Sequence, residues 1–336
     1  MPADPVLLTG GSGFVGGALL ERLVADGRQV RALVRSDAAA AAVSALGAAP
    51  VRGDVLDAAS LRDAVSGCAR VFHVAGVNAM CRRDPSAMHR TNVEGPANVI
   101  RAAVAAGVDR IVVTSSAAAI GEVAGTVGRE DSAHRGSYLS RYERSKHLGE
   151  RRARALGAEL GVEVVCLNPA SVQGPGRLEG SARLLLELVG GRLPALVDTT
   201  ISIVDVADCT EGHVLAERRG APGERYLLSG ATCTTHEAVT LVRSLWGRPE
   251  RVRWIPSAVA RVGGAGAEAL GRILRRDLPV CREAVRTLLH GHRYDGSRAE
   301  RELGLRYTPL AATIERALTW YAERGLVPER VTGPRP

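Results

Sequence analysis

The sequence contains no apolar run of the roughly 18 or more residues that a transmembrane helix requires. Its start, Met1-Pro2-Ala3-Asp4, lacks the charged end and apolar stretch of a secretory signal peptide. The six cysteines form no Cys-x-x-Cys pair, and none lies at metal-ligand spacing from a histidine, so we expect neither a disulfide nor a bound zinc or other metal ion. Together these absences predict a cytoplasmic protein with no membrane span.

Aromatic residues make up only 3% of the chain, which favours a ligand pocket lined by Leu, Val and Ala over one built on ring stacking. The net charge of +8 comes from scattered arginines rather than from a block, so the sequence does not predict nucleic-acid binding. It does predict affinity for an anionic ligand. A polyphosphate cofactor would already satisfy that prediction.

Short segments rich in β-branched residues alternate with Ala- and Leu-rich segments of helical period in the first half of the chain. This alternation predicts an α/β fold with a Rossmann-type, doubly wound parallel sheet. We assign residues 1–170 to this domain, with a helix and strand in about 201–230 returning to its sheet. Residues 171–336 form a smaller, mostly helical and discontinuous lobe. The expected strands are 5–8, 30–34, 51–54, 70–75, 110–114 and 162–167.

A glycine-rich turn, Thr9 to Gly16, follows the first expected strand and opens a helix. In such a turn Gly10 permits the tight bend, Gly13 lets backbone N–H groups approach a pyrophosphate, and Gly16 allows the helix to pack closely on its strand. The spacing is Gly-x-x-Gly-x-x-Gly, which differs from the Gly-x-Gly-x-x-Gly dinucleotide fingerprint. In its strand-to-helix context the turn still predicts dinucleotide binding.

Tyr142 and Lys146 lie four residues apart in a segment of helical character, so one helix face carries both side chains. A tyrosine phenol has a pKa of about 10, too high for efficient proton transfer at neutral pH. An ammonium group one turn away stabilises the phenolate and lowers that pKa. The pair therefore predicts the proton donor of a carbonyl reduction, against the alternative of a surface tyrosine and a solvated lysine.

With Thr114-Ser115-Ser116 at the end of an apolar strand, the glycine turn and the Tyr-x-x-x-Lys pair resemble the extended short-chain dehydrogenase/reductase superfamily, in particular its NAD(P)-dependent epimerase/dehydratase group. Residues 295–305 resemble the closing segment of dihydroflavonol reductase-like and hopanoid-associated sugar epimerase-like members. The resemblance covers nearly the whole chain and implies a substrate-binding role for the lobe 171–336. It implies catalytic roles for Ser116, Tyr142, Lys146 and Asn92.

Two of these roles come from the resemblance alone. Ser116 would hydrogen-bond the substrate oxygen, and Asn92 would brace the backbone and a water near Lys146. An isolated asparagine is otherwise a common helix cap. The family's threonine after Gly95 is Pro96 here, which is a departure from the family pattern.

The residues after the second expected strand bear on the choice of cofactor. Val34-Arg35-Ser36 offers no carboxylate for a ribose 2′-hydroxyl and one guanidinium suited to a 2′-phosphate, so NADP(H) is preferred, with NAD(H) as the alternative. The resemblance adds Asp54 and Val55 at the adenine edge. The full set of expected cofactor contacts is Thr9, Gly10, Gly13, Phe14, Val15, Gly16, Arg35, Asp54, Val55, Val74, Ala75, Gly76, Thr114, Tyr142, Lys146, Pro169, Ala170 and Val172.

Family dehydratases carry an Asp-Glu pair after the catalytic hydroxyl, whereas Ser116 is followed by Ala117-Ala118-Ala119. Family epimerases usually carry the carboxylate that selects NAD, and Arg35 argues against that. We therefore predict an NADP(H)-dependent oxidoreductase that reversibly transfers hydride between nicotinamide and a carbonyl or secondary alcohol. The alternatives are an NAD(P)-dependent sugar epimerase and, from another class, a non-catalytic NADP-binding protein.

The expected partner is a small carbonyl or alcohol substrate of medium or bulky apolar character, and a homodimer is considered. The segment 255–262 and the helix that continues to Leu274 have one further interpretation, peripheral contact with a membrane. The alternative is an ordinary helix pair of the smaller lobe. The flanking basic residues are Arg251, Arg253, Arg275 and Arg276.

Overall fold

The computed structural model of the chain describes residues 5–193, 195–247 and 252–330. Its main feature is a seven-stranded parallel sheet of order β3-β2-β1-β4-β5-β6-β9, which confirms the predicted Rossmann-type fold. The strand order reverses between β1 and β4, so a crevice for ligands is expected beyond their carboxyl ends. The strands are β1 Val6–Thr9, β2 Val30–Val34, β3 Ala49–Arg52, β4 Arg70–His73, β5 Arg110–Thr114, β6 Glu163–Pro169 and β9 Arg225–Leu228.

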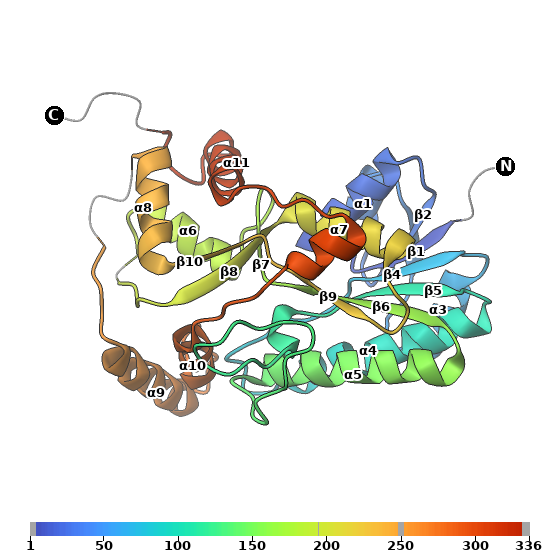
Figure 1. Cartoon of the computed structure of the whole chain (residues 1–336), viewed down its shortest axis with the longest axis horizontal. Helices are drawn as coiled ribbons and strands as arrows, with labels where there is room; N and C mark the ends of the chain where they lie inside the picture. Colours follow the sequence, from blue (N-terminus) through green and yellow to red (C-terminus); the bar gives the residue numbers. More distant parts are fainter. Residues whose placement is uncertain (1–4, 194, 248–251, 331–336) are drawn as a thin grey trace.

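Helices cover both faces of this sheet (Figure 1). In β1, Val6 and Leu8 enter the core under one helical layer and Leu7 enters the core under the other, which explains why these three consecutive residues are apolar. The first layer contains α1 Phe14–Ala25, α2 Asp37–Ala45 and α7 Val206–Arg219, and the second contains α3 Ala58–Val65, α4 Ser86–Ala105 and α5 Arg141–Leu160.

The smaller lobe is built around a three-stranded sheet of order β10-β8-β7. Within the segment 201–230, β8 pairs with β7 and β10, whereas α7 and β9 join the large sheet. A separate core lies between α6, α8 and α11. The strands of this lobe are β7 Ser171–Gln173, β8 Thr200–Asp205 and β10 Ala231–Thr234, and its helices are α6 Ser181–Val189, α8 Thr235–Trp246, α9 Ser257–Leu274, α10 Arg282–His290 and α11 Leu310–Glu323.

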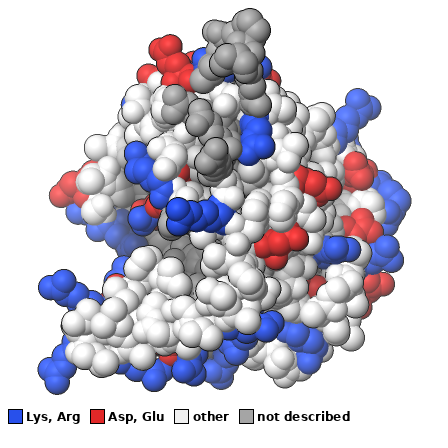
Figure 2. All heavy atoms as spheres, turned by 90° about the vertical axis from the view of Figure 1, so that its left-hand side faces the viewer, with Lys and Arg blue, Asp and Glu red and all other residues white. Residues whose placement is uncertain are grey.

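Helix α9 packs on α10 through small residues, since a Cβ at Gly264 would lie 2.7 Å from the side chain of Val285. Val262 and Ile273 on α9 are 73% and 78% exposed. The membrane contact considered for this helix stays a prediction, and Arg251 lies outside the described residues. None of the helices in the described ranges combines the length and apolar character that crossing a bilayer requires. The face that carries α9 and α10 is hollowed, with basic side chains around the hollow (Figure 2).

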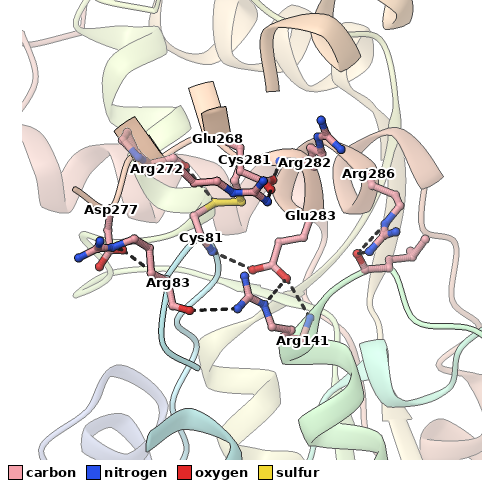
Figure 3. The surroundings of a disulfide bond; sticks show 12 residues. Cys81, Arg83, Arg141, Glu268, Arg272, Asp277, Cys281, Arg282, Glu283 and Arg286 are labelled. Carbon is pink, nitrogen blue, oxygen red and sulfur yellow. Dashed lines mark hydrogen bonds and ion pairs between the residues drawn. A yellow bond between two sulfur atoms is a disulfide. The ribbon is translucent and has the colours of Figure 1, made fainter. Parts of the chain in front are cut away.

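The expectation that the chain has no disulfide is wrong, because Cys81 and Cys281 are bonded, with Cα atoms 5.5 Å apart (Figure 3). Cys81 lies in the loop after β4, and Cys281 is the N-cap residue of α10. The two are 200 residues apart in sequence, and their spacing therefore gives no sign of the pairing. The bond ties the smaller lobe to the large domain. Stable disulfides are unusual in cytoplasmic proteins, so the cytoplasmic location stays a prediction.

We expect reduction of this disulfide to lower the free energy of unfolding by roughly 2–4 kcal/mol, because the bond closes a long loop in the unfolded chain. Thermal unfolding with and without dithiothreitol measures the change, and Cys281→Ser is the matched control that the reductant leaves unaffected. Thiol titration in denaturant checks the bond itself: four thiols before reduction and six after it. Six thiols in the unreduced protein would contradict the disulfide.

Candidate active site

The glycine turn brings the carboxyl ends of β1 and β4 together at the point where the strand order reverses. Gly10 has φ +77°, and a Cβ there would lie 2.6 Å from the Ala75 backbone nitrogen. The Thr9 hydroxyl accepts a hydrogen bond from that same nitrogen at 3.2 Å and lies 2.8 Å from His73 Nδ1. At Gly16 a Cβ would lie 2.0 Å from the Gly10 carbonyl oxygen. The turn therefore packs closely against both β4 and α1, and the N-terminus of α1, where backbone N–H groups can bind an anion, lies at this turn.

Tyr142 lies in the first turn of α5, which begins at Arg141 because Ser140 Oγ accepts a hydrogen bond from Glu143 N at 3.2 Å. Burial raises the pKa of the Tyr142 phenol, and a hydrogen bond with the Ser116 side chain and the positive charge of Arg177 partly oppose that rise. The expectation that Lys146 lowers this pKa stays a prediction.

Lys146 is the only lysine of the chain, whose other 43 basic residues are all arginine. It is 9% exposed, and its Nζ donates to the Thr114 carbonyl oxygen at 3.0 Å. Burial lowers its pKa to about 8, and the carboxylate of Glu150 acts in the opposite direction. An arginine would keep its charge in this position, whereas a buried lysine titrates near neutral pH. The isolated lysine is a sequence signal that adds weight to the Tyr142–Lys146 pair.

Ser116 follows β5 and caps a short 3-10 helix, η1 Ala117–Ala119, by accepting a hydrogen bond from Ala118 N at 3.3 Å. Its hydroxyl also faces Tyr142. The neighbouring Ser115 Oγ is buried and has no hydrogen-bond partner among the described residues. The structure thus brings Ser116, rather than Ser115, to the phenol.

Asn92 is buried on α4 and connects the loop after β4 to α5. Its Oδ1 accepts from Val77 N and its Nδ2 donates to Val77 O, both at 2.8 Å. The same Nδ2 donates to Ser145 Oγ at 2.9 Å, and Ser145 Oγ donates to the Tyr142 carbonyl oxygen at 2.7 Å. This geometry agrees with the bracing role that the resemblance implies. Pro96 is accommodated inside α4, which runs through it.

Arg35 lies just beyond the end of β2, with Nη1 3.8 Å from Asp54 Oδ2 at the end of β3. Its side chain is 72% exposed, so the ion pair is weak and leaves the guanidinium able to turn toward a phosphate. Ser36 is occupied as the N-cap of α2. The other expected cofactor contacts end or follow the same parallel strands, or lie in β7: Phe14, Val15, Val55, Val74, Gly76, Pro169, Ala170 and Val172.

The structure adds Arg177, which sequence analysis missed although it directly follows the Gly174-Pro175-Gly176 turn. Its guanidinium lies 5.7 Å from the centroid of the Phe14 ring and donates to the Val172 carbonyl oxygen. Its charge also acts on Tyr142. Arg177 therefore lies between the glycine turn and the β7 strand, with no carboxylate partner among the described residues, where it can meet an anionic group.

A second missed group consists of Glu122, His290 and His292, whose ligand atoms lie within 4.8 Å of one another. Their arrangement has the geometry to hold a metal ion. However, Glu122 Oε1 already lies 2.6 Å from His292 Nδ1, and Arg135 donates to the Glu122 carbonyl oxygen at 2.9 Å, which adds a positive charge beside the site. The expectation of no metal site stays a prediction.

Residues 6–228 match the family described as NAD dependent epimerase/dehydratase. The chain is 32% identical to a putative dihydroflavonol 4-reductase of Synechocystis sp. (strain ATCC 27184 / PCC 6803 / Kazusa), across 97% of this chain and 96% of that protein. It is also 32% identical to sterol demethylase protein B of Methylococcus capsulatus (strain ATCC 33009 / NCIMB 11132 / Bath), across 96% and 99%. The crystal structure of gox2253 superimposes with a TM-score of 0.85 at 30% identity, covering 96% of this chain and 99% of that one.

We expect Lys146→Met to raise the free energy of unfolding at pH 7. The folded-state pKa of about 8 lies below the usual 10.5, so the unfolded chain binds more protons between these values and the stability of the unmodified protein increases with pH across that window. The buried charge destabilises the folded protein by roughly 3 kcal/mol below pH 8. Loss of the hydrogen bond to Thr114 reduces the gain in stability of the variant by about 1 kcal/mol.

Urea unfolding of the two proteins at pH 7, 9 and 10.5 measures this difference. The other titrating groups contribute equally to both proteins, so their contributions cancel. The difference in free energy of unfolding in favour of Lys146→Met should therefore shrink toward pH 10.5. A gap that is independent of pH would show that the ammonium is not destabilised by burial.

Proposed function

The chain belongs to the NAD dependent epimerase/dehydratase family, and we propose that within it the protein is an NADP(H)-dependent oxidoreductase. The proposed reaction is reversible hydride transfer between nicotinamide and a carbonyl or secondary alcohol. One observation carries this proposal: the Ser116 side chain hydrogen-bonds Tyr142, and Lys146, one helical turn further on, donates to the Thr114 carbonyl oxygen at the end of β5. The name of the Synechocystis relative, a putative reductase, points to the same class.

The residues have distinct roles in the proposed reaction. A bound nicotinamide would supply or accept the hydride at the substrate carbon. Tyr142 donates its proton to the carbonyl oxygen, and Ser116 donates a hydrogen bond to the same oxygen and positions it. Lys146 holds the ribose hydroxyls and, once its ammonium turns from the Thr114 carbonyl toward them, stabilises the phenolate that remains. Asn92 holds the loop after β4 in place against α5 through its hydrogen bonds to Val77 and Ser145.

Dehydration fits the site poorly, because Ser116 leads into the apolar Ala117–Ala119 turn rather than into a pair of carboxylates. The sugar epimerase remains the second candidate. Its supporting observation is the Asp54 carboxylate 3.8 Å from Arg35, which offsets part of the positive charge that would select a 2′-phosphate. A non-catalytic NADP-binding protein would have no need of the buried Lys146 and its unfavourable desolvation.

We expect Tyr142→Phe to lower turnover by on the order of 100-fold or more while the affinity for NADPH is retained, because the change removes the proton donor and little packing. The measurement is NADPH oxidation with a panel of ketones and aldehydes, alongside cofactor titration by fluorescence. Tyr138→Phe, four residues ahead of Tyr142, is the control and should react normally. Near-normal turnover of Tyr142→Phe would refute its role.

We expect Arg35→Ala to weaken NADPH binding roughly tenfold or more and to leave NADH binding almost unchanged. A charge-assisted contact between the guanidinium and a 2′-phosphate contributes about 1.5–3 kcal/mol to the free energy of binding. Because the side chain is exposed to solvent, we expect a contribution at the lower end of this range. Arg62→Ala on α3 is the matched control for the loss of an exposed positive charge. Equal binding of both cofactors by the unmodified protein would instead favour the epimerase.

A further inference from the structure

A cavity of about 990 Å³ lies between the smaller lobe and three loops of the large domain. Helices α9 and α10 form one side of it. The opposite side contains Cys81–Arg83 from the loop after β4, Ala124 from the chain beyond η1, and Leu139 and Arg141 just ahead of Tyr142. All three loops continue from elements of the candidate active site. Arg141, the residue before Tyr142, places one wall of the cavity at the N-terminus of α5.

Positive charge is concentrated in this cavity. Eight arginines and two glutamates line it, and Asp277 lies beside two of those arginines. Eight cations against three carboxylates leave an excess of five positive charges, a large share of the net +8 of the whole chain. Eight arginines that are scattered in the sequence thus line one cavity of the fold.

The carboxylates are already committed to ion pairs (Figure 3). Arg82 and Arg83 share Asp277, at 3.2 and 3.6 Å. Glu283 lies 3.5 Å from Arg141. Glu268 pairs with Arg272, and Glu268 also accepts a hydrogen bond from the backbone N–H of residue 282 at 3.1 Å. Among the described residues, no carboxylate of this cavity remains to neutralise its other arginines.

Four arginines have no carboxylate partner among the described residues. Arg286 donates through Nε to the Leu139 carbonyl oxygen at 2.7 Å, which leaves its charge uncompensated. The side chains of Arg261, Arg276 and Arg282 have neither an ion pair nor a hydrogen bond in the part of the chain that the structure describes. A guanidinium without a counter-charge can form bidentate hydrogen bonds with a carboxylate or phosphoryl group, and such a group in the cavity would offset part of its excess positive charge.

The same cavity has an apolar side. Leu278, Val280, Val285 and Leu289 line it beside the arginines, and His290 contributes the one aromatic ring among the described lining residues. Its volume is at the upper end of the range for drug-sized ligands, about 300–1,000 Å³. A small ketone would leave most of it unfilled.

We propose that this cavity binds an amphiphilic anion, with an apolar chain against α9 and α10 and a carboxylate or phosphoryl group among its unpaired arginines. One part of the inference rests on the proposed function: that this amphiphile is also the carbonyl substrate. The anionic group anchors the substrate in the cavity, and the carbonyl on its apolar body reaches Tyr142.

Calorimetric titration below the micellar concentration tests the site, with saturating NADP⁺ present to occupy the dinucleotide site. The probes are laurate, dodecyl phosphate and the neutral dodecanol. We expect at least one anion to bind tenfold or more tightly than dodecanol, and the tighter anion identifies the head group. Arg261→Gln/Arg282→Gln should weaken that anion about tenfold or more and leave dodecanol unchanged. Arg152→Gln, an exposed arginine of α5, is the control.

Equal affinities for dodecanol and both anions, or an anion affinity that the double variant leaves intact, would overturn the proposal. Both substituted arginines are exposed and unpaired, so the fold should tolerate their loss, and an unchanged thermal midpoint verifies this. If anion binding depends on these arginines but none of the carbonyl compounds supports NADPH oxidation, the binding site stands and the reductase is rejected. Turnover of neutral ketones without anion binding would do the reverse.

Discussion

The close approach of the β1 and β4 ends is the constraint on which the site depends. Gly10 lies against the Ala75 backbone, and the Thr9 hydroxyl joins that backbone to His73. Any side chain at position 10 would push the two strands apart where the sheet reverses its order. Because the strands meet here, the N-terminus of α1 and the loop held by Asn92 lie at the carboxyl ends of these strands, where a ligand crevice is expected.

At this place in the fold, the buried Lys146 ammonium that the proposed reaction requires lowers the stability of the folded protein. Burial of its ammonium destabilises the folded state and lowers its pKa to about 8. The Thr114 carbonyl oxygen and the nearby Glu150 carboxylate offset part of the cost. A chain that otherwise uses arginine for every basic position keeps its single lysine here, where a compact cation that can lose its proton suits the chemistry.

The smaller lobe makes a different contribution, since it adds a second charged region beside the crevice. The Cys81–Cys281 bond and the Arg82, Arg83 and Arg141 ion pairs fasten α9 and α10 to the loops that lead into the active site. These contacts consume the available carboxylates and leave the remaining arginines facing the cavity. The ion pairs that attach the lobe therefore also leave the cavity with the excess positive charge that favours an anionic ligand.

The sequence by itself determined the features that depend on neighbouring residues. The alternation of strands and helices, the glycine turn at Gly10 and the one-turn spacing of Tyr142 and Lys146 all follow from local backbone geometry and periodicity. Only the tertiary structure decided that Cys81 meets Cys281, that scattered arginines surround one cavity, that Arg177 reaches Phe14, and that Lys146 binds Thr114 rather than Tyr142. The reason is physical: these contacts join residues 32 to 200 positions apart, and their proximity depends on how whole elements pack, which no local pattern records.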